Sequence, residues 1–286
     1  MQIDIVDVFA EARYQGNQLA VVRDAAALDS TAMQAIAREM NFSETTFVVA
    51  HETGVDDPSA VAATNRAPRD HAAVRIFTPA EELPFAGHPT LGTAWVLTDG
   101  GRRDIVLQLA AGDVAVRFAD GLAWMTPPEA SFGRVLPTAD AAALIGLAEH
   151  DLDATLPPRL LRCGPEFPMI AVRDLQTLKR IRVDAESSQA LGIPGFPFAF
   201  CQGGYSADAD FAARMLFFDG VGLREDPATG SANAALAALL RAHGRQGRLV
   251  VEQGFEIERP SRIYLDVGAT LQVGGRVSGV VRGQLL

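Results

Sequence analysis

Residues Phe85 to Leu97 read FAGHPTLGTAWVL, and residues Asp226 to Leu240 read DPATGSANAALAALL. Each stretch begins with a polar turn that contains Gly and continues as an apolar run, which is the pattern of a buried helix. Each also follows a short β-rich run at a similar interval. His88 and Ser231 lie 143 positions apart, which is half of the 286 residues. We interpret the two stretches as an internal duplication around which the rest of the chain is organised.

The two helix starts share a chemistry suited to anions. Gly87 and Gly230 allow the backbone to approach a ligand closely. The first turn of a helix has unpaired N–H groups and the positive end of the helix dipole, so it can bind an anion. Two such starts, one in each half, could face each other across a cleft and hold a small carboxylate. The alternative is a pair of ordinary capped helices that serve only packing; their duplication favours the site.

Composition limits the class of protein. The length predicts about two domains at roughly 150 residues each, and 48% hydrophobic with 21% charged residues is enough for sizeable cores. A net charge of −10 argues against nucleic acid or an anionic membrane as a partner. Only Cys163 and Cys201 are present, so no disulfide framework is expected. With no secretory signal or spanning segment indicated, we expect a cytoplasmic protein.

Short strands separated by Gly, together with few long helices, predict an α+β fold with one buried helix wrapped by sheet in each half. Pro127 and Pro128 begin a composition shift. We therefore place a first domain at 1–126, completed by the C-terminal strand at about 276–286, and a second domain at 127–275. Residues 51–69 are expected to form an exposed loop or hairpin tip. Helices are predicted over about 30–39, 88–97, 139–147, 175–182, 185–191 and 229–243.

Several segments resemble the PhzF family of phenazine-biosynthesis-like isomerases. They are NFSETTF at 41–47, RIFTP at 75–79, FAGHPT at 85–90 and EDPATGSA at 225–232. The matches run in order over nearly the whole chain. The resemblance implies a diaminopimelate-epimerase-like fold of two similar domains, each a β-barrel-like sheet around a central helix, with the active site between them. It also implies a homodimer that uses no metal or organic cofactor. The best-known activity of the family is isomerisation of trans-2,3-dihydro-3-hydroxyanthranilate.

The resemblance assigns catalytic roles to three side chains. From the sequence alone, a carboxylate such as Glu44 is more often an exposed turn residue. The motif match reverses this and makes Glu44 the candidate general acid/base that moves a proton between carbons of one substrate. His88 could polarise or protonate the substrate, although a lone His before Pro is more often a capping or packing residue. Asp226 by itself is a good helix N-cap before Pro227, and the resemblance adds a role in orienting substrate or assisting proton transfer.

The candidate substrate-binding residues surround these groups. Gly230 and Ser231 would supply backbone N–H and hydroxyl donors to a carboxylate. Gly87, Thr229 and Asn17 complete the predicted set.

Other mechanisms are disfavoured. Ser231 is not in a nucleophile elbow, no phosphate-cradling loop occurs, and five scattered His give no metal site. Racemases of this fold use two Cys, one at each helix start, and neither stretch contains Cys. Together with these exclusions, the resemblance implies a cofactor-independent isomerase acting on a small, cyclic carboxylate. An epimerase or lyase of the same fold, or a catalytically silent metabolite-binding protein, is the alternative.

Overall fold

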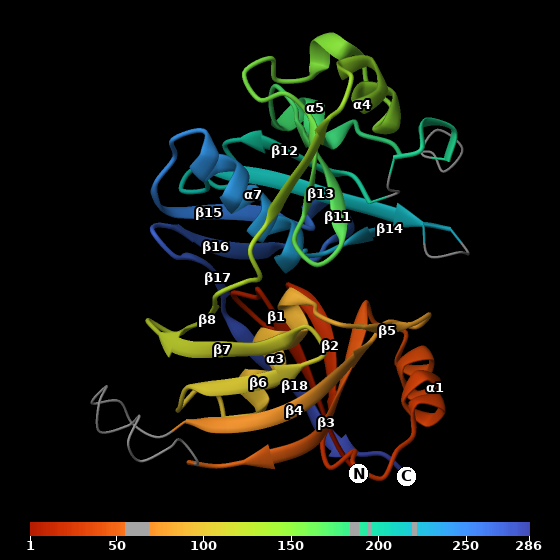
Figure 1. The fold of residues 1–286 in the computed structure, drawn as a ribbon, viewed down its shortest axis with the longest axis vertical. Coiled ribbons are helices and arrows are strands. Elements are labelled where there is room, and N and C mark those ends of the chain that lie inside the picture. The colour runs from red at the N-terminus through yellow and green to blue at the C-terminus, as the bar shows by residue number, and fades with distance from the viewer. Residues whose placement is uncertain (55–68, 184–188, 194–195, 219–221) are drawn as a thin grey trace. The chain divides into compact units, whose positions relative to one another are not determined.

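The computed structural model describes residues 1–54, 69–183, 189–193, 196–218 and 222–286. The chain divides into two compact units (Figure 1). Unit 1 comprises Met1–Thr126 and Gly274–Leu286, and unit 2 comprises Pro127–Val273. The C-terminal strand therefore belongs with the N-terminal half of the chain. The predicted loop at 51–69 and the predicted helix at 185–191 lie largely or partly outside the described residues.

Unit 1 is a sheet wrapped around one helix, α3 (Gly87–Leu97), which contacts strands on several sides (Figure 1). A second helix, α1 (Ser30–Met40), packs on β3 and β4. The two chain ends meet, because Leu285 N donates to Met1 O at 2.8 Å. The strands are β1 (Gln2–Val8), β2 (Asn17–Val22), β3 (Glu44–Glu52), β4 (Asp70–Phe77), β5 (Glu82–Leu83), β6 (Ile105–Leu109), β7 (Gly112–Ala119), β8 (Leu122–Met125) and β18 (Val277–Gln284). Strand β17 (Leu271–Gly275) lies across the boundary between the units.

Unit 2 contains the buried helix α7 (Gly230–Ala242), which packs on β16. Its smaller helices are α4 (Thr138–Leu144) and α5 (Leu175–Lys179), with 3-10 turns η1 (Glu149–Asp151) and η2 (Phe255–Ile257). The strands are β9 (Ser131–Val135), β10 (Arg159–Arg162), β11 (Glu166–Ala171), β12 (Phe198–Gln202), β13 (Phe211–Phe218), β14 (Leu223–Asp226), β15 (Gly247–Gln253) and β16 (Ser261–Val267).

The strand pairing is repeated in the two units. In unit 1, β1–β2 is antiparallel, β2–β3 parallel and β3–β4 antiparallel; β4 then pairs antiparallel with β5 and parallel with β6. In unit 2 the same sequence of pairings runs through β10, β11, β12, β13, β14 and β15. The helix follows the short strand in both, as α3 after β5 and α7 after β14. The structure thus confirms the α+β fold of two similar halves.

Burial explains why the two repeated stretches dominate the fold. Residues Gly230 to Leu240 of α7 are all buried, and so is nearly all of α3. Both helices contain many small residues, Gly, Ala and Thr in α3 and Gly, Ser and Ala in α7, which allow a sheet to close around a helix on most sides. Each helix therefore acts as the core of its unit.

Several local predictions can be compared directly with the structure. Asp29 caps α1 as expected, accepting from Ala32 N at 2.8 Å. The predicted helix at 175–182 ends early, at Lys179. Strands β9 and β10 were not predicted, because both are short and β9 is mostly exposed, so neither has a clear alternation of apolar residues. No helix in the described part of the chain is long and apolar enough to cross a bilayer.

Candidate active site

Glu44 is the first residue of β3, where the chain re-enters the sheet after α1. Asn41 ends α1 in the left-handed conformation, with φ 53°, and the chain then turns into the strand. At the strand start, Glu44 pairs in parallel register with Leu19 of β2. Its side chain is only 15% exposed. Glu44 is therefore a largely buried carboxyl group, not the exposed turn residue that the sequence alone would allow.

His88 lies in the first turn of α3 and is 4% exposed. Its Nε2 atom is 3.4 Å from Glu44 Oε2, and its Nδ1 atom is 3.3 Å from Asn17 Nδ2. Three residues predicted from different parts of the sequence, from the start of β2, the start of β3 and the start of α3, are thus brought together. Gly87, directly before the histidine, is the first residue of the helix.

Burial controls the charge of His88. Loss of solvent around the ring lowers the pKa of His88 to about 3, and a backbone contact with Gln18, which favours the charged form, does not offset this. The imidazole is therefore neutral near pH 7, so its approach to Glu44 is not an ion pair. At 3.4 Å the two atoms are in contact without the alignment of a hydrogen bond. Such contacts in ligand-free sites often tighten when substrate binds.

A neutral imidazole has one donor nitrogen and one acceptor nitrogen. If Nε2 carries the proton, it can donate to the ionised Glu44 carboxylate. In the other tautomer, which requires the Asn17 amide to turn its oxygen towards Nδ1, Nε2 can accept from the protonated carboxyl group. The His88 ring can therefore match both protonation states of Glu44, which is what a group that alternately takes and gives a proton requires.

Asp226 is the last residue of β14 and is 7% exposed. Its Oδ2 atom accepts a hydrogen bond of 2.6 Å from Thr229 Oγ1. The interpretation of Asp226 as the N-cap of the following helix is wrong, because α7 begins at Gly230 and its N-cap is Thr229. The three residues between Asp226 and the helix form a separate turn, which the sequence pattern of Asp followed by Pro did not distinguish from a capped first turn.

The helix starts themselves carry no side-chain cap. Neither Ala86, the N-cap of α3, nor Thr229 makes a side-chain hydrogen bond to a first-turn amide. Gly230 and Ser231 occupy the first two positions of α7, and Ser231 is 8% exposed. The helix start therefore retains the geometry expected of an anion site, and the substrate role of both residues stays a prediction.

Gln253, the last residue of β15, is a member of this group that the sequence analysis missed. It is fully buried, and its side-chain amide bonds the turn between Asp226 and α7. The signal available in the sequence was a polar amide at the end of an apolar strand, immediately before Gly254. Gly254 has φ +77°, and a Cβ there would lie 2.6 Å from Pro227 O, so the two segments pack backbone against backbone.

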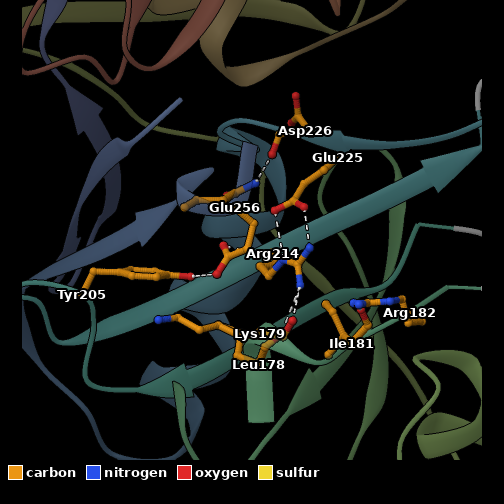
Figure 2. Close-up of polar contacts among 10 residues, drawn as sticks. Leu178, Lys179, Ile181, Arg182, Tyr205, Arg214, Glu225, Asp226 and Glu256 are labelled. Carbon is orange, nitrogen blue, oxygen red and sulfur yellow. Dashed lines mark hydrogen bonds and ion pairs between the residues drawn. The ribbon is translucent and has the colours of Figure 1, made fainter. Parts of the chain in front are cut away.

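On the other face of β14, Glu225 binds Arg214 of β13 (Figure 2). The guanidinium forms a two-bond fork, with Nε to Oε1 at 3.0 Å and Nη2 to Oε2 at 2.6 Å. Its Nη1 donates to the carbonyls of Leu178 and Lys179 at 3.3 and 3.2 Å. Tyr205 Oη donates to Glu256 at 2.6 Å beside this fork. The end of β14 that presents Asp226 is therefore fixed by a buried ionic network.

Neither the two cysteines nor a cluster of metal-ligating side chains contributes to the two helix starts in the part of the chain that the structure describes. Cys163 and Cys201 are both buried, and burial raises the pKa of their thiols to about 12 and about 11, respectively. Neither lies at the start of α3 or α7. Among the described residues, no group of three or more His, Cys, Asp or Glu side chains is arranged to hold a metal ion. The groups available for chemistry at the two helix starts are thus carboxyl groups, an imidazole and hydroxyls.

A largely buried carboxyl group in contact with a neutral imidazole, on a fold of two similar halves, defines an enzyme of the acid–base class. The family model for "phenazine biosynthesis-like protein" matches residues 6–283. The chain belongs to this PhzC-PhzF family and is an isomerase.

Relatives and solved structures agree with this assignment. A trans-2,3-dihydro-3-hydroxyanthranilate isomerase of Pseudomonas aeruginosa is 33% identical, covering 96% of this chain and 92% of its own. An uncharacterized isomerase of Mesorhizobium japonicum is 35% identical, covering 98% and 97%. Among solved structures, a predicted epimerase from Pseudomonas aeruginosa has a TM-score of 0.79 and 34% identity over 100% of this chain and 99% of its own. A probable proline racemase from Agrobacterium radiobacter shares the fold alone, with a TM-score of 0.58 and 13% identity over 100% and 92%.

Proposed function

We propose that this enzyme moves a proton between two carbons of a small, cyclic carboxylate of the trans-2,3-dihydro-3-hydroxyanthranilate type, without a cofactor. Glu44 takes a proton from one carbon as the C–H bond breaks and returns it to another carbon, so the reaction has no net proton change. The contact between the largely buried Glu44 carboxyl group and the neutral His88 ring carries the proposal, since a neutral imidazole can donate to the ionised carboxylate or accept from the protonated one. The relatives named as isomerases of that substrate support its choice.

The remaining predicted residues have supporting roles in this proposal. His88 holds Glu44 through Nε2, and it polarises the substrate when substrate takes the place of one of its two ring contacts. Asp226 orients the substrate or assists proton transfer, and the first turn of α7, with Gly230 and Ser231, binds the substrate carboxylate. Gly87, Asn17 and Thr229 complete the binding residues, Asn17 through its contact with the His88 ring.

The test is turnover of trans-2,3-dihydro-3-hydroxyanthranilate by the wild type, by Glu44→Gln and by Glu52→Gln, followed by absorbance. Glu52 is an exposed carboxylate at the opposite end of the same strand, so it serves as the matched control. We expect conversion by the wild type and the control, and a loss of at least about 100-fold in Glu44→Gln, the range for removal of a general acid/base. Equal turnover by Glu44→Gln would refute the assignment of the base.

Epimerisation is a second candidate, favoured by the 34% identity to a structure described as a predicted epimerase. An epimerase returns the proton to the same carbon, whereas the proposed isomerase returns it to a different one. Product analysis by NMR after reaction in deuterated water separates them, because the label appears at the original stereocentre only in the epimerase. No conversion of trans-2,3-dihydro-3-hydroxyanthranilate by the wild type, together with epimerisation of another small carboxylate, would replace the first proposal with this one.

We also propose a homodimer, on the family resemblance of the sequence, and a cytoplasmic location, because a chain with only two cysteines suits a reducing compartment. Sedimentation equilibrium of the purified chain measures its mass against the 30.4 kDa of one copy.

A further inference from the structure

The turn between Asp226 and α7 is held by one buried side chain, that of Gln253. Its Oε1 atom accepts from Thr229 N at 3.1 Å and from Asn233 Nδ2 at 3.2 Å. Its Nε2 atom donates to Asp226 O and to Thr229 Oγ1, both at 2.9 Å. A glutamine amide has two donor hydrogens and two acceptor lone pairs, so all four are used. These partners also determine which end of the amide is oxygen.

The hydrogen bonds have a fixed direction that ends at the Asp226 carboxylate. Thr229 Oγ1 accepts from Gln253 Nε2, and its own single hydrogen is donated to Asp226 Oδ2 at 2.6 Å. A hydroxyl that accepts one bond and donates another becomes polarised, which strengthens both bonds in a buried setting. Gln253 therefore orients Thr229, and Thr229 in turn fixes the rotation of the carboxylate.

The corresponding positions of unit 1 lack this chain of bonds. Strand register makes Ile76 equivalent to Met215, and the residues that pair with them, Leu83 and Asp226, are equivalent in turn. Three residues before Ile76 and Met215, Ala73 pairs with Gln108 and Ala212 pairs with Glu252 in parallel register. Gln108 and Glu252 are therefore equivalent, and so are the next residues, Leu109 and Gln253.

Thr229, directly before the helix, corresponds to Ala86. The set Asp226, Thr229 and Gln253 in unit 2 is thus replaced in unit 1 by Leu83, Ala86 and Leu109. Since the same topology forms in unit 1 without any polar group at these positions, the fold does not require the chain of bonds.

We propose that Thr229 and Gln253 are positioning residues that hold the Asp226 carboxylate in the orientation needed for turnover. This inference rests on the proposed function, in which Asp226 acts on the substrate. A carboxylate free to rotate would lose the geometry on which its contribution depends, and misplacement by about 1 Å can cost about 100-fold in rate. Gln253 acts on Asp226 through Thr229, and this hold on Asp226 is how Thr229 contributes to the substrate-binding set.

The chain supplies a matched control for the hydroxyl. Asp174 and Thr177 have the same spacing as Asp226 and Thr229, at the start of α5 in the same unit. Thr177 binds the Asp174 carboxylate through both its backbone N–H and its side chain, and it is buried. Thr177→Val therefore removes an equivalent hydroxyl from an aspartate that belongs to no proposed site.

The experiment compares Thr229→Val, Thr229→Ser and Thr177→Val in the full chain. Thr229→Val is preferred to Gln253→Leu because Gln253→Leu removes four buried hydrogen bonds and leaves their partners unsatisfied, which is expected to destabilise the protein severely. We expect Thr229→Val to lower kcat by about 10- to 100-fold with KM within about threefold. Thr177→Val should stay within about threefold of the wild type, and Thr229→Ser, which keeps the hydroxyl, should retain a higher kcat than Thr229→Val. A kcat in Thr229→Val equal to that of Thr177→Val would overturn the proposal.

A second measurement does not depend on turnover. In protein labelled with ¹³C at aspartate carboxyl carbons, the Asp226 resonance is identified by its absence in Asp226→Asn. We expect it to move in Thr229→Val and to keep its position in Thr229→Ser and Thr177→Val. If the wild type converts no substrate, the proposed function fails while this comparison still decides the positioning role. An unmoved Asp226 resonance in Thr229→Val would reject it.

Discussion

The same arginine–glutamate fork occurs in both halves of the molecule, in different surroundings. Arg75 of β4 binds Glu82 of β5 with Nε to Oε1 at 2.7 Å and Nη2 to Oε2 at 2.6 Å. Arg214 of β13 binds Glu225 of β14 through the same pairs of atoms. The first pair is 30% and 37% exposed, whereas the second is 7% and 5% exposed. The fork is thus a feature of the repeated fold, and the two copies differ in their burial and in the further partners of the arginine.

The side chains proposed for chemistry show the opposite behaviour, since they are not repeated. By register, Thr46 corresponds to Phe198, so Glu44 corresponds to Phe196. His88 corresponds to Ser231 at the helix start, and Asp226 corresponds to Leu83. Each half has a carboxyl group where the other has an apolar side chain. The comparison teaches that duplication supplied the frame and that divergence at a few buried positions supplied the chemistry.

The largest effect should come from breaking the two forks separately. Arg214→Met leaves the Glu225 carboxylate buried without its partner, which costs about 3–5 kcal/mol in the free energy of unfolding. Arg75→Met leaves the Glu82 carboxylate accessible to water, so loss of this ion pair should lower the free energy of unfolding by at most about 1 kcal/mol. Urea unfolding of both variants measures the two values. Equal losses in the free energy of unfolding would show that burial does not change how much each arginine–glutamate pair contributes to stability.

Removing the carboxylate of unit 2 should have the next largest effect. Asp226→Asn keeps an acceptor for the Thr229 hydroxyl but removes the charge, and we expect kcat to fall at least about 100-fold, the range for a group that assists proton transfer. The control is Asp174→Asn, which keeps a good helix cap and should leave kcat within about twofold. Steady-state kinetics on the same substrate decides this, and an unchanged kcat in Asp226→Asn would confine the chemistry to unit 1.

The smallest effect concerns pH and compares His88 with its counterpart Ser231. The pKa of His88 is about 3 in the folded protein, against about 6.5 in the unfolded chain. Below pH 6.5 the unfolded chain binds a proton that the folded protein does not, so this contribution to stability is complete above pH 6.5 and is lost as the pH falls towards 3. At pH 5 the loss is about 2 kcal/mol.

Unfolding free energies at pH 7.5 and pH 5 test this for the wild type, His88→Gln and Ser231→Ala. The wild type and Ser231→Ala should lose about 2 kcal/mol more on acidification than His88→Gln, which has no imidazole to protonate. Parallel losses in all three proteins would mean that the His88 ring is charged, or accessible to protons, in the folded state.

Much of the frame could be predicted from the sequence because the responsible signals are local. The cap of α1 at Asp29, the apolar runs of α3 and α7, and the strands Ile105–Leu109 and Leu122–Met125 follow from periodicity and capping chemistry within a few residues. The repetition at 143 positions indicated two similar halves before any strand pairing was known. Strands β9 and β10 were missed because both are short and lack a clear alternation of apolar residues, and β9 pairs with β10 about 25 to 30 residues away.

The sequence by itself determined the α+β class, the duplicated helices and, through the resemblance of its motifs, the candidates Glu44, His88 and Asp226. Only the tertiary structure decided that Glu44 is largely buried against a neutral imidazole, that Asp226 ends a strand instead of capping a helix, and that Gln253 holds the turn that follows. The physical reason is that local propensities depend on neighbours along the chain, whereas desolvation and hydrogen-bond direction depend on neighbours in space.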